Sequence, residues 1–206
     1  MARWHRKALT GFVLVLTAFT PTLLQPVTAG ADGNIYAFNY NVDASTHLKT
    51  LNETIDVPGG KFYGTIDFGS DYLKGQIRLP QTTFTYSAAG ILPLLTATAK
   101  ISPVKAVTGT VDLSSLTVTA TATIWIRILD AHVNGTTTNL VGTTCMTAAP
   151  IVVTMSGPVS LGSASTFSGD FTMPKFKGCG AVQTQALDVA LSGPGNTFSA
   201  TATPAG

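Results

Sequence analysis

The chain has 206 residues, of which 45% are hydrophobic and 11% are charged, and its formal net charge is +2. These values exclude an intrinsically disordered protein, because disordered chains combine low hydrophobicity with high net charge. The length is that of one domain.

The first 31 residues have the pattern of a secretory signal peptide. A basic segment at 3–7 precedes an apolar stretch at 8–24, and small residues permit cleavage after Ala29 or Ala31. An uncleaved membrane anchor is the alternative, since the apolar stretch nearly reaches the roughly 17 residues of a short span. We expect cleavage, and therefore a protein that is secreted or associated with the cell envelope and has no remaining transmembrane span.

Residues 32–206 are predicted to form a single all-β domain. Without the first 31 residues, nine basic side chains stand against ten acidic ones, so the basic character of the whole chain comes from its N-terminus. No basic patch remains, which argues against nucleic acid as a partner.

From residue 34 onward, apolar and polar residues alternate with a period of two, which is typical of half-buried β-strands. No segment shows a sustained helical period. Gly, Pro and Asn clusters separate the strands, with a turn expected at 58–60, a connection at 103–109 and a hairpin turn at Asn134-Gly135. This pattern predicts an antiparallel β-sandwich or a flattened barrel. The predicted strands are 34–42, 61–68, 73–79, 84–86, 91–101, 117–128, 151–155, 167–173, 187–191 and 198–202.

The longest unbroken alternation is Thr117–Ile128, which we expect to organise the sheet. Its apolar row contains Ala120 and Ala122, whose small side chains leave space for neighbouring side chains or for an apolar ligand. Its other row forms a possible surface-binding face for ice or a sugar ring, although a solvated sheet face is the simpler interpretation. That row contains Thr119, Thr121, Thr123 and Trp125.

Two segments share the pattern apolar-x-Gly-x-apolar-x-apolar-Pro: Leu73–Pro80 and Phe167–Pro174. A glycine within a strand and a proline at its end are two uncommon features, so their repetition suggests an internal duplication. The two related halves would meet near 103–110. Coincidence in a glycine-rich chain is the alternative.

Cys145 and Cys179 are the two cysteines of the chain. In an oxidising compartment two cysteines most simply form one disulfide. A metal site with two cysteine ligands is the alternative, but it lacks supporting histidines.

Residues with catalytic chemistry are few. Asp130 and His132 could project from one face of a strand end as a metal pair or an acid–base dyad, but a solvated turn is the simpler interpretation. His47 lies in an ordinary polar segment, and Asp67 with Asp71 flank a turn as the best candidate carboxylate pair. No nucleophile elbow and no metalloprotease motif occur. We therefore assign no catalytic, cofactor-binding or metal-binding residue, and we expect no cofactor and no enzymatic activity.

The C-terminal third resembles small exported all-β proteins of high-GC Gram-positive, actinobacterial type. The segments that carry this resemblance are Thr144–Pro150, Phe171–Gly180 and Gly193–Thr197. The resemblance implies a Cys145–Cys179 pair and an extracellular or envelope location, and it brings no activity with it.

Three functions remain open. The first is a non-enzymatic exported module that binds a partner or a glycan, or has a structural role, at the cell surface. The second is a carrier that holds a lipid or another apolar ligand between sheets or halves. The third is a hydrolase that uses Asp130, His132 and a serine from elsewhere in the chain.

Overall fold

The computed structural model describes residues 34–86 and 95–205. The signal peptide predicted at 1–31 lies outside the described residues, as does the first part of the strand predicted at 91–101. The described chain consists of antiparallel strands and one helix, so the predicted all-β class is confirmed.

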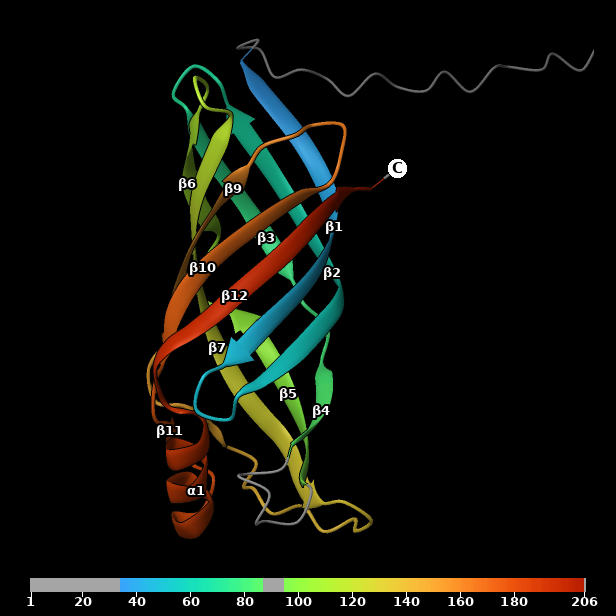
Figure 1. Ribbon diagram of the computed structural model, residues 1–206, viewed down its shortest axis with the longest axis vertical. Helices are drawn as coiled ribbons and strands as arrows, with labels where there is room; N and C mark the ends of the chain where they lie inside the picture. Colours follow the sequence, from blue (N-terminus) through green and yellow to red (C-terminus); the bar gives the residue numbers. More distant parts are fainter. Residues whose placement is uncertain (1–33, 87–94, 206) are drawn as a thin grey trace, which may run out of the picture.

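Eight strands close into an antiparallel barrel (Figure 1). Their order around the barrel follows the chain, and closure comes from the pairing of β12 with β1 and of β7 with β9. Of the two architectures that the sequence left open, the structure has the barrel. A closed sheet gives each strand a partner on both sides. The barrel strands are β1 (Ile35–Leu48), β2 (Glu53–Asp67), β3 (Tyr72–Arg78), β6 (Val107–Asp112), β7 (Thr117–Val133), β9 (Ile151–Pro158), β10 (Ser165–Met173) and β12 (Gly193–Pro204).

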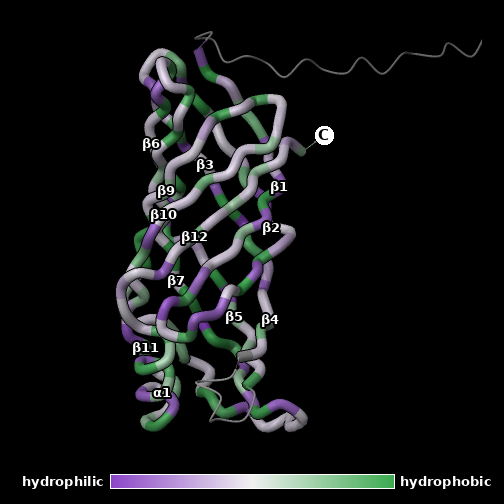
Figure 2. The backbone as a smooth tube through the Cα atoms, in the orientation of Figure 1, coloured by the Kyte–Doolittle hydropathy of each residue, from purple (hydrophilic) through white to green (hydrophobic). Residues whose placement is uncertain are grey.

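β7 organises the sheet, as its alternation predicts. Val118, Ala120, Ala122 and Ile128 are buried, while Thr119 and Arg127, at alternate positions, are exposed. The first half of β7 pairs with β6 and β9 inside the barrel. Its second half extends beyond the barrel and pairs with β5, so one strand links both parts. Hydrophobic and hydrophilic residues alternate in the same way along the other barrel strands (Figure 2).

The remaining elements gather toward the lower end of the barrel in Figure 1. Here Cys145 and Cys179 form the predicted disulfide, with a Cα–Cα distance of 4.1 Å, and both side chains are buried. Leu187 and Leu191 of the helix pack into the same apolar cluster. These elements are β4 (Thr82–Tyr86), β5 (Leu95–Pro103), β8 (Met146–Thr147), β11 (Phe176–Lys177) and α1 (Ala181–Leu191).

The strand predicted at 187–191 is wrong, because these residues end helix α1. The alternation of Leu187, Val189 and Leu191 suggested a strand, but the side chain of Val189 is 77% exposed. Leu187 and Leu191, four residues apart, form the buried side of the helix. The preceding alanines and glutamines are strong helix formers, and they decide the local structure.

One expected turn is wrong, and one expected connection is shorter than predicted. Residues 58–60 lie inside β2, where a register shift opposite Val42 and Ala44 forms a bulge, and the Gly59 amide donates to the carboxylate of Asp43. The connection expected at 103–109 is limited to residues 104–106, because β5 ends at Pro103 and β6 begins at Val107. The turn at Asn134-Gly135 is present, with a positive φ at Gly135 and a hydrogen bond from the Thr136 amide to the Val133 carbonyl, but no regular strand follows it.

The repeated glycine motif falls on β3 and β10, which are the third strands of the first and second four-strand halves of the barrel. This placement agrees with a duplication, which stays a prediction.

Candidate functional site

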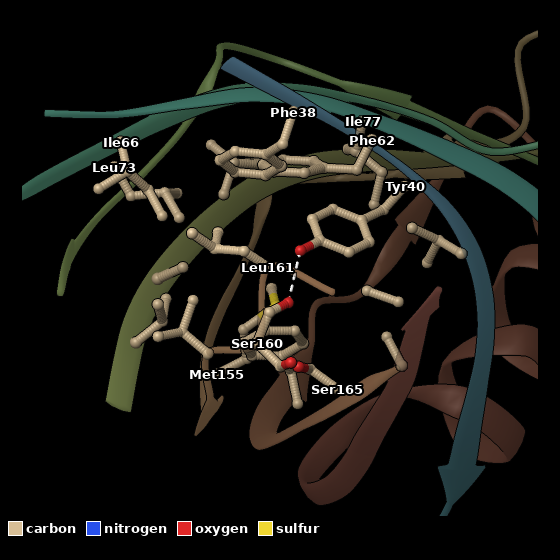
Figure 3. A pocket seen from close by; sticks show the side chains of 18 of the residues that line it. Phe38, Tyr40, Phe62, Ile66, Leu73, Ile77, Met155, Ser160, Leu161 and Ser165 are labelled. Atoms are coloured by element: carbon tan, nitrogen blue, oxygen red, sulfur yellow. Dashed lines mark hydrogen bonds between the residues drawn. The ribbon is translucent and has the colours of Figure 1, made fainter. Parts of the chain in front are cut away.

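The barrel interior contains two adjoining cavities of about 80 and 70 Å³. All eight barrel strands contribute to the wall of the larger one, together with the loop between β9 and β10 (Figure 3). Both walls are almost entirely carbon, and neither includes a charged side chain. The interior therefore offers apolar space that is lined by the barrel strands.

Small side chains on inward-facing positions create this space. Ala120, Ala200 and Ala202 line the larger cavity, while Ala44 and Ala122 line the smaller one. Each occupies an inward position that a larger apolar residue could fill. Close packing is the rule in protein interiors, so a row of alanines facing a void is a feature that needs an explanation.

Aromatic rings form one wall of the larger cavity. The ring centroids of Phe38 and Phe62 lie 5.9 Å apart, and Tyr40 packs on Phe38 at 5.2 Å. Glycines make room for these rings: a Cβ atom on Gly64 or Gly75 would come within 2.7 or 2.3 Å of a phenylalanine ring atom. The rings are thereby fixed on one side and leave the alanine side open.

Three side chains separate the two cavities. Ile77, Met155 and Phe198 line both of them. Met155 has three rotatable bonds and no branch, so it changes shape at low cost compared with its neighbours.

The few polar atoms at the larger cavity come from Tyr40, Ser160 and Ser165, which Figure 3 shows grouped together. The Tyr40 hydroxyl donates to the Ser160 carbonyl at 2.6 Å. Burial raises the pKa of Tyr40 above its ordinary value, with a smaller contribution from the neighbouring Tyr36. Ser165 is 4% exposed, and its hydroxyl has no hydrogen-bond partner.

The β9–β10 loop, residues 159–164, lies in the upper half of the barrel in Figure 1 and contributes Val159, Ser160 and Leu161 to the wall of the larger cavity. β9 and β10 pair at three positions, which is the shortest ladder in the barrel. The loop is attached through Tyr40 and through the Val159 amide, which donates to the Leu116 carbonyl at 2.8 Å. The upper end therefore has fewer constraints than the disulfide-linked lower end.

The predicted surface-binding face lies on the outside of the barrel. Thr119 is exposed and pairs with Ser156, while Thr121 pairs with Thr154, with their hydroxyl oxygens 3.4 Å apart. The ammonium group of Lys177 lies 5.6 Å from the centre of the Trp125 ring. A cation–π contact of this kind occupies the ring face that a sugar would stack on.

Asp130 and His132 are in contact, with 2.6 Å between the His132 Nδ1 and the Asp130 carboxylate. Within the part of the chain that the structure describes, no hydroxyl hydrogen bonds to the other ring nitrogen, and no three metal-ligating side chains gather into a site. His47 contacts the Thr54 hydroxyl at 3.4 Å. Asp67 accepts hydrogen bonds from Ser70 and from the Gly69 amide, which lower its pKa and give it a turn-capping role.

The sequence identified Ala120 and Ala122 as the potential space, but it did not identify Ser165 as part of the cavity. The alternation of inward and outward positions along β10 could have identified Ser165. It lies two residues before Phe167 on the inward side of β10, where a lone hydroxyl among apolar residues is unusual.

No helix among residues 34–86 and 95–205 has the length and apolar character needed to cross a bilayer. Comparisons with protein-family models, with curated proteins and with solved structures find no match to this chain.

Proposed function

We propose that this protein is an exported, non-enzymatic carrier that holds one slender apolar molecule inside its barrel. The observation that carries the proposal is the pair of charge-free cavities, separated by Met155 and two neighbouring side chains. Export is supported by the signal-peptide pattern and by the disulfide between Cys145 and Cys179.

The size of the cavities limits the ligand. Each one is smaller than the engineered cavity of about 150 Å³ that binds benzene, whereas the two together are of that size. The two cavities share Ile77, Met155 and Phe198, so an unbranched alkyl chain that reaches from one to the other fits them better than a fused ring system. Burial stabilises such a chain by about 0.8 kcal/mol per methylene group.

Native mass spectrometry of the protein purified from its own host tests this proposal, because a carrier retains its ligand. We expect a bound mass that Ala120→Leu removes, since the larger side chain occupies the cavity. Ala37→Leu, an equal change on the outside of β1, should keep the bound mass. A second measurement is methyl NMR during titration with n-hexane. If n-hexane leaves the signals of Met155 and Ala120 unchanged, and no mass is retained, the carrier proposal is wrong.

The absence of enzymatic activity needs its own test, because Asp130 and His132 are in contact. We expect no turnover on a broad panel of esters and glycosides. Turnover that His132→Ala abolishes would instead support a hydrolase.

A surface-binding module is the second candidate, and paired hydroxyls on the outer face favour it. Thr83 pairs with Thr98 at 2.9 Å and Thr85 with Thr96 at 3.2 Å, on the adjoining strands β4 and β5. Co-sedimentation with polysaccharide from the host envelope tests this candidate. Binding that Thr83→Val and Thr98→Val weaken together would support it.

A further inference from the structure

We infer that the bound molecule is a neutral alkyl chain with a single uncharged hydrogen-bonding group, of the alcohol type, and that Ser165 holds this group. The inference rests on the proposed carrier function and specifies the chemical class of its ligand.

Ser165 provides the first observation. It is 4% exposed, it occupies an inward position on β10, and its hydroxyl has no partner. Buried hydroxyls are normally hydrogen-bonded, because an unpaired one loses its bonds to water without replacement. Ser165 also lines the larger cavity, so a molecule inside the barrel is in a position to supply the missing partner.

The surrounding polar atoms show what kind of group fits. The Tyr40 hydroxyl uses its hydrogen for the Ser160 carbonyl, which leaves the Tyr40 oxygen with acceptor capacity. The Ser165 hydroxyl can donate as well as accept. A ligand hydroxyl, which does both, therefore matches this side of the cavity, whereas the rest of the wall is carbon.

The absence of charge excludes an ionised head group. No Lys, Arg or His side chain lines either cavity, so a carboxylate would be buried without a counter-charge. Burying an unpaired ion is so costly that the group binds in its neutral form instead. The site therefore discriminates against a fatty acid at neutral pH and accepts the matching alcohol.

The experiment compares n-hexanol, n-hexane and hexanoate, titrated against the full exported chain and followed by methyl NMR. Ser165→Ala should weaken the binding of n-hexanol about five-fold, which is the effect of losing one neutral hydrogen bond. The affinity for n-hexane should stay within about two-fold of the wild-type value. Ser168→Ala, on the outward side of the same strand, is the matched control and should change neither the dissociation constant for n-hexanol nor that for n-hexane.

Hexanoate should bind at least about 100-fold more weakly than n-hexanol near pH 7, because a carboxyl group with a pKa of about 4.5 is almost wholly ionised there. Its affinity should rise about ten-fold for each pH unit lost between roughly 7 and 5, since only the neutral form binds.

Three outcomes are possible refutations, and each one refutes a different claim. If Ser165→Ala lowers the affinities for n-hexane and n-hexanol equally, Ser165 only shapes the cavity, and the inference is overturned. Hexanoate that binds as tightly as n-hexanol near neutral pH would overturn the neutral-ligand class. If neither n-hexane nor n-hexanol binds, the carrier proposal itself is wrong.

Discussion

Replacing Ala120 by leucine should stabilise the unliganded protein while it blocks ligand uptake. Ala120 is buried on β7 and lines the larger cavity, and the substitution adds three carbon atoms on its inward side. Stability and binding should therefore move in opposite directions. This opposition is the expected behaviour of a cavity that is kept open for a ligand rather than left by poor packing.

The magnitude follows from the cavity volume. Cavities reduce the free energy of unfolding by about 24 cal/mol per Å³, so a cavity of about 80 Å³ corresponds to roughly 2 kcal/mol. Leucine cannot match the cavity shape completely, so we expect a gain of about 1 kcal/mol. For a chain of this length that gain raises Tm by about 2–4 °C.

Urea unfolding measures this gain, with the m-value checked for constancy so that a shift in midpoint reports stability alone. Ala37→Leu, on the outer face of β1, serves as the control and should stay within about 0.5 kcal/mol of the wild type. A loss of 1 kcal/mol or more in Ala120→Leu would mean that the side chain is overpacked, as about 1–3 kcal/mol is the usual cost of overpacking. That result would refute the accessible cavity beside Ala120.

Three other predictions concern the ends of the barrel. Changing both Cys145 and Cys179 to serine should lower the free energy of unfolding by about 3–4 kcal/mol, the chain-entropy cost for a separation of 34 residues, and a urea midpoint equal to that of the wild type would contradict this. Tyr40→Phe removes the hydrogen bond to Ser160, so we expect faster amide exchange across residues 159–164 and faster ligand release, with Tyr63→Phe on the outer face of β2 as the unaffected control. Hydrogen bonds from Ser114 and Ser115 lower the pKa of Asp112 to about 2, so its stabilising effect is present above its unfolded pKa of about 3.9 and is lost as pH falls toward 2. Asp112→Asn should therefore reduce the loss of stability between pH 5 and 2, and an unchanged pH profile would count against the role of this turn.

The sequence predicts the strands where alternation is strict, and it fails where a local feature interrupts it. Thr117–Ile128 was found because no residue breaks its period. β6 was missed because Gly109 interrupts its apolar row; a Cβ atom there would lie 2.3 Å from the Thr119 carbonyl, so only glycine permits this approach of β6 to β7. The bulge at Gly59 was taken for a turn because a positive φ has the same sequence signature in both.

The closure of the sheet and the presence of the cavities could not be predicted from the sequence, for a different reason. Alternation shows which side chains face inward, but it does not show which strands pair, so sandwich and barrel give the same pattern. The pairing of β7 with β9, which closes the barrel, depends on contacts over 27 to 41 residues of chain, from Ile124 with Ile151 to Thr117 with Pro158. The space beside Ala120 is also lined by Ala200 and Ala202, which come from a strand distant in the sequence.

The two ends of the barrel differ in a way that indicates where a ligand enters. At the lower end, the disulfide and α1 are part of the same buried cluster as Phe171, so opening there would disrupt a covalently linked core. At the upper end, the loop at 159–164 lines the larger cavity, and Tyr40 connects it to β1 by one hydrogen bond, worth about 0.5–1.5 kcal/mol. Proteins open locally where the free-energy cost is lowest. We therefore expect a ligand to enter and leave past the loop at 159–164, next to the short β9–β10 ladder. Ser165, the first residue of β10, stands at that route. A head group held there would leave the alkyl chain directed toward Met155 and the second cavity, which is the orientation that fills both.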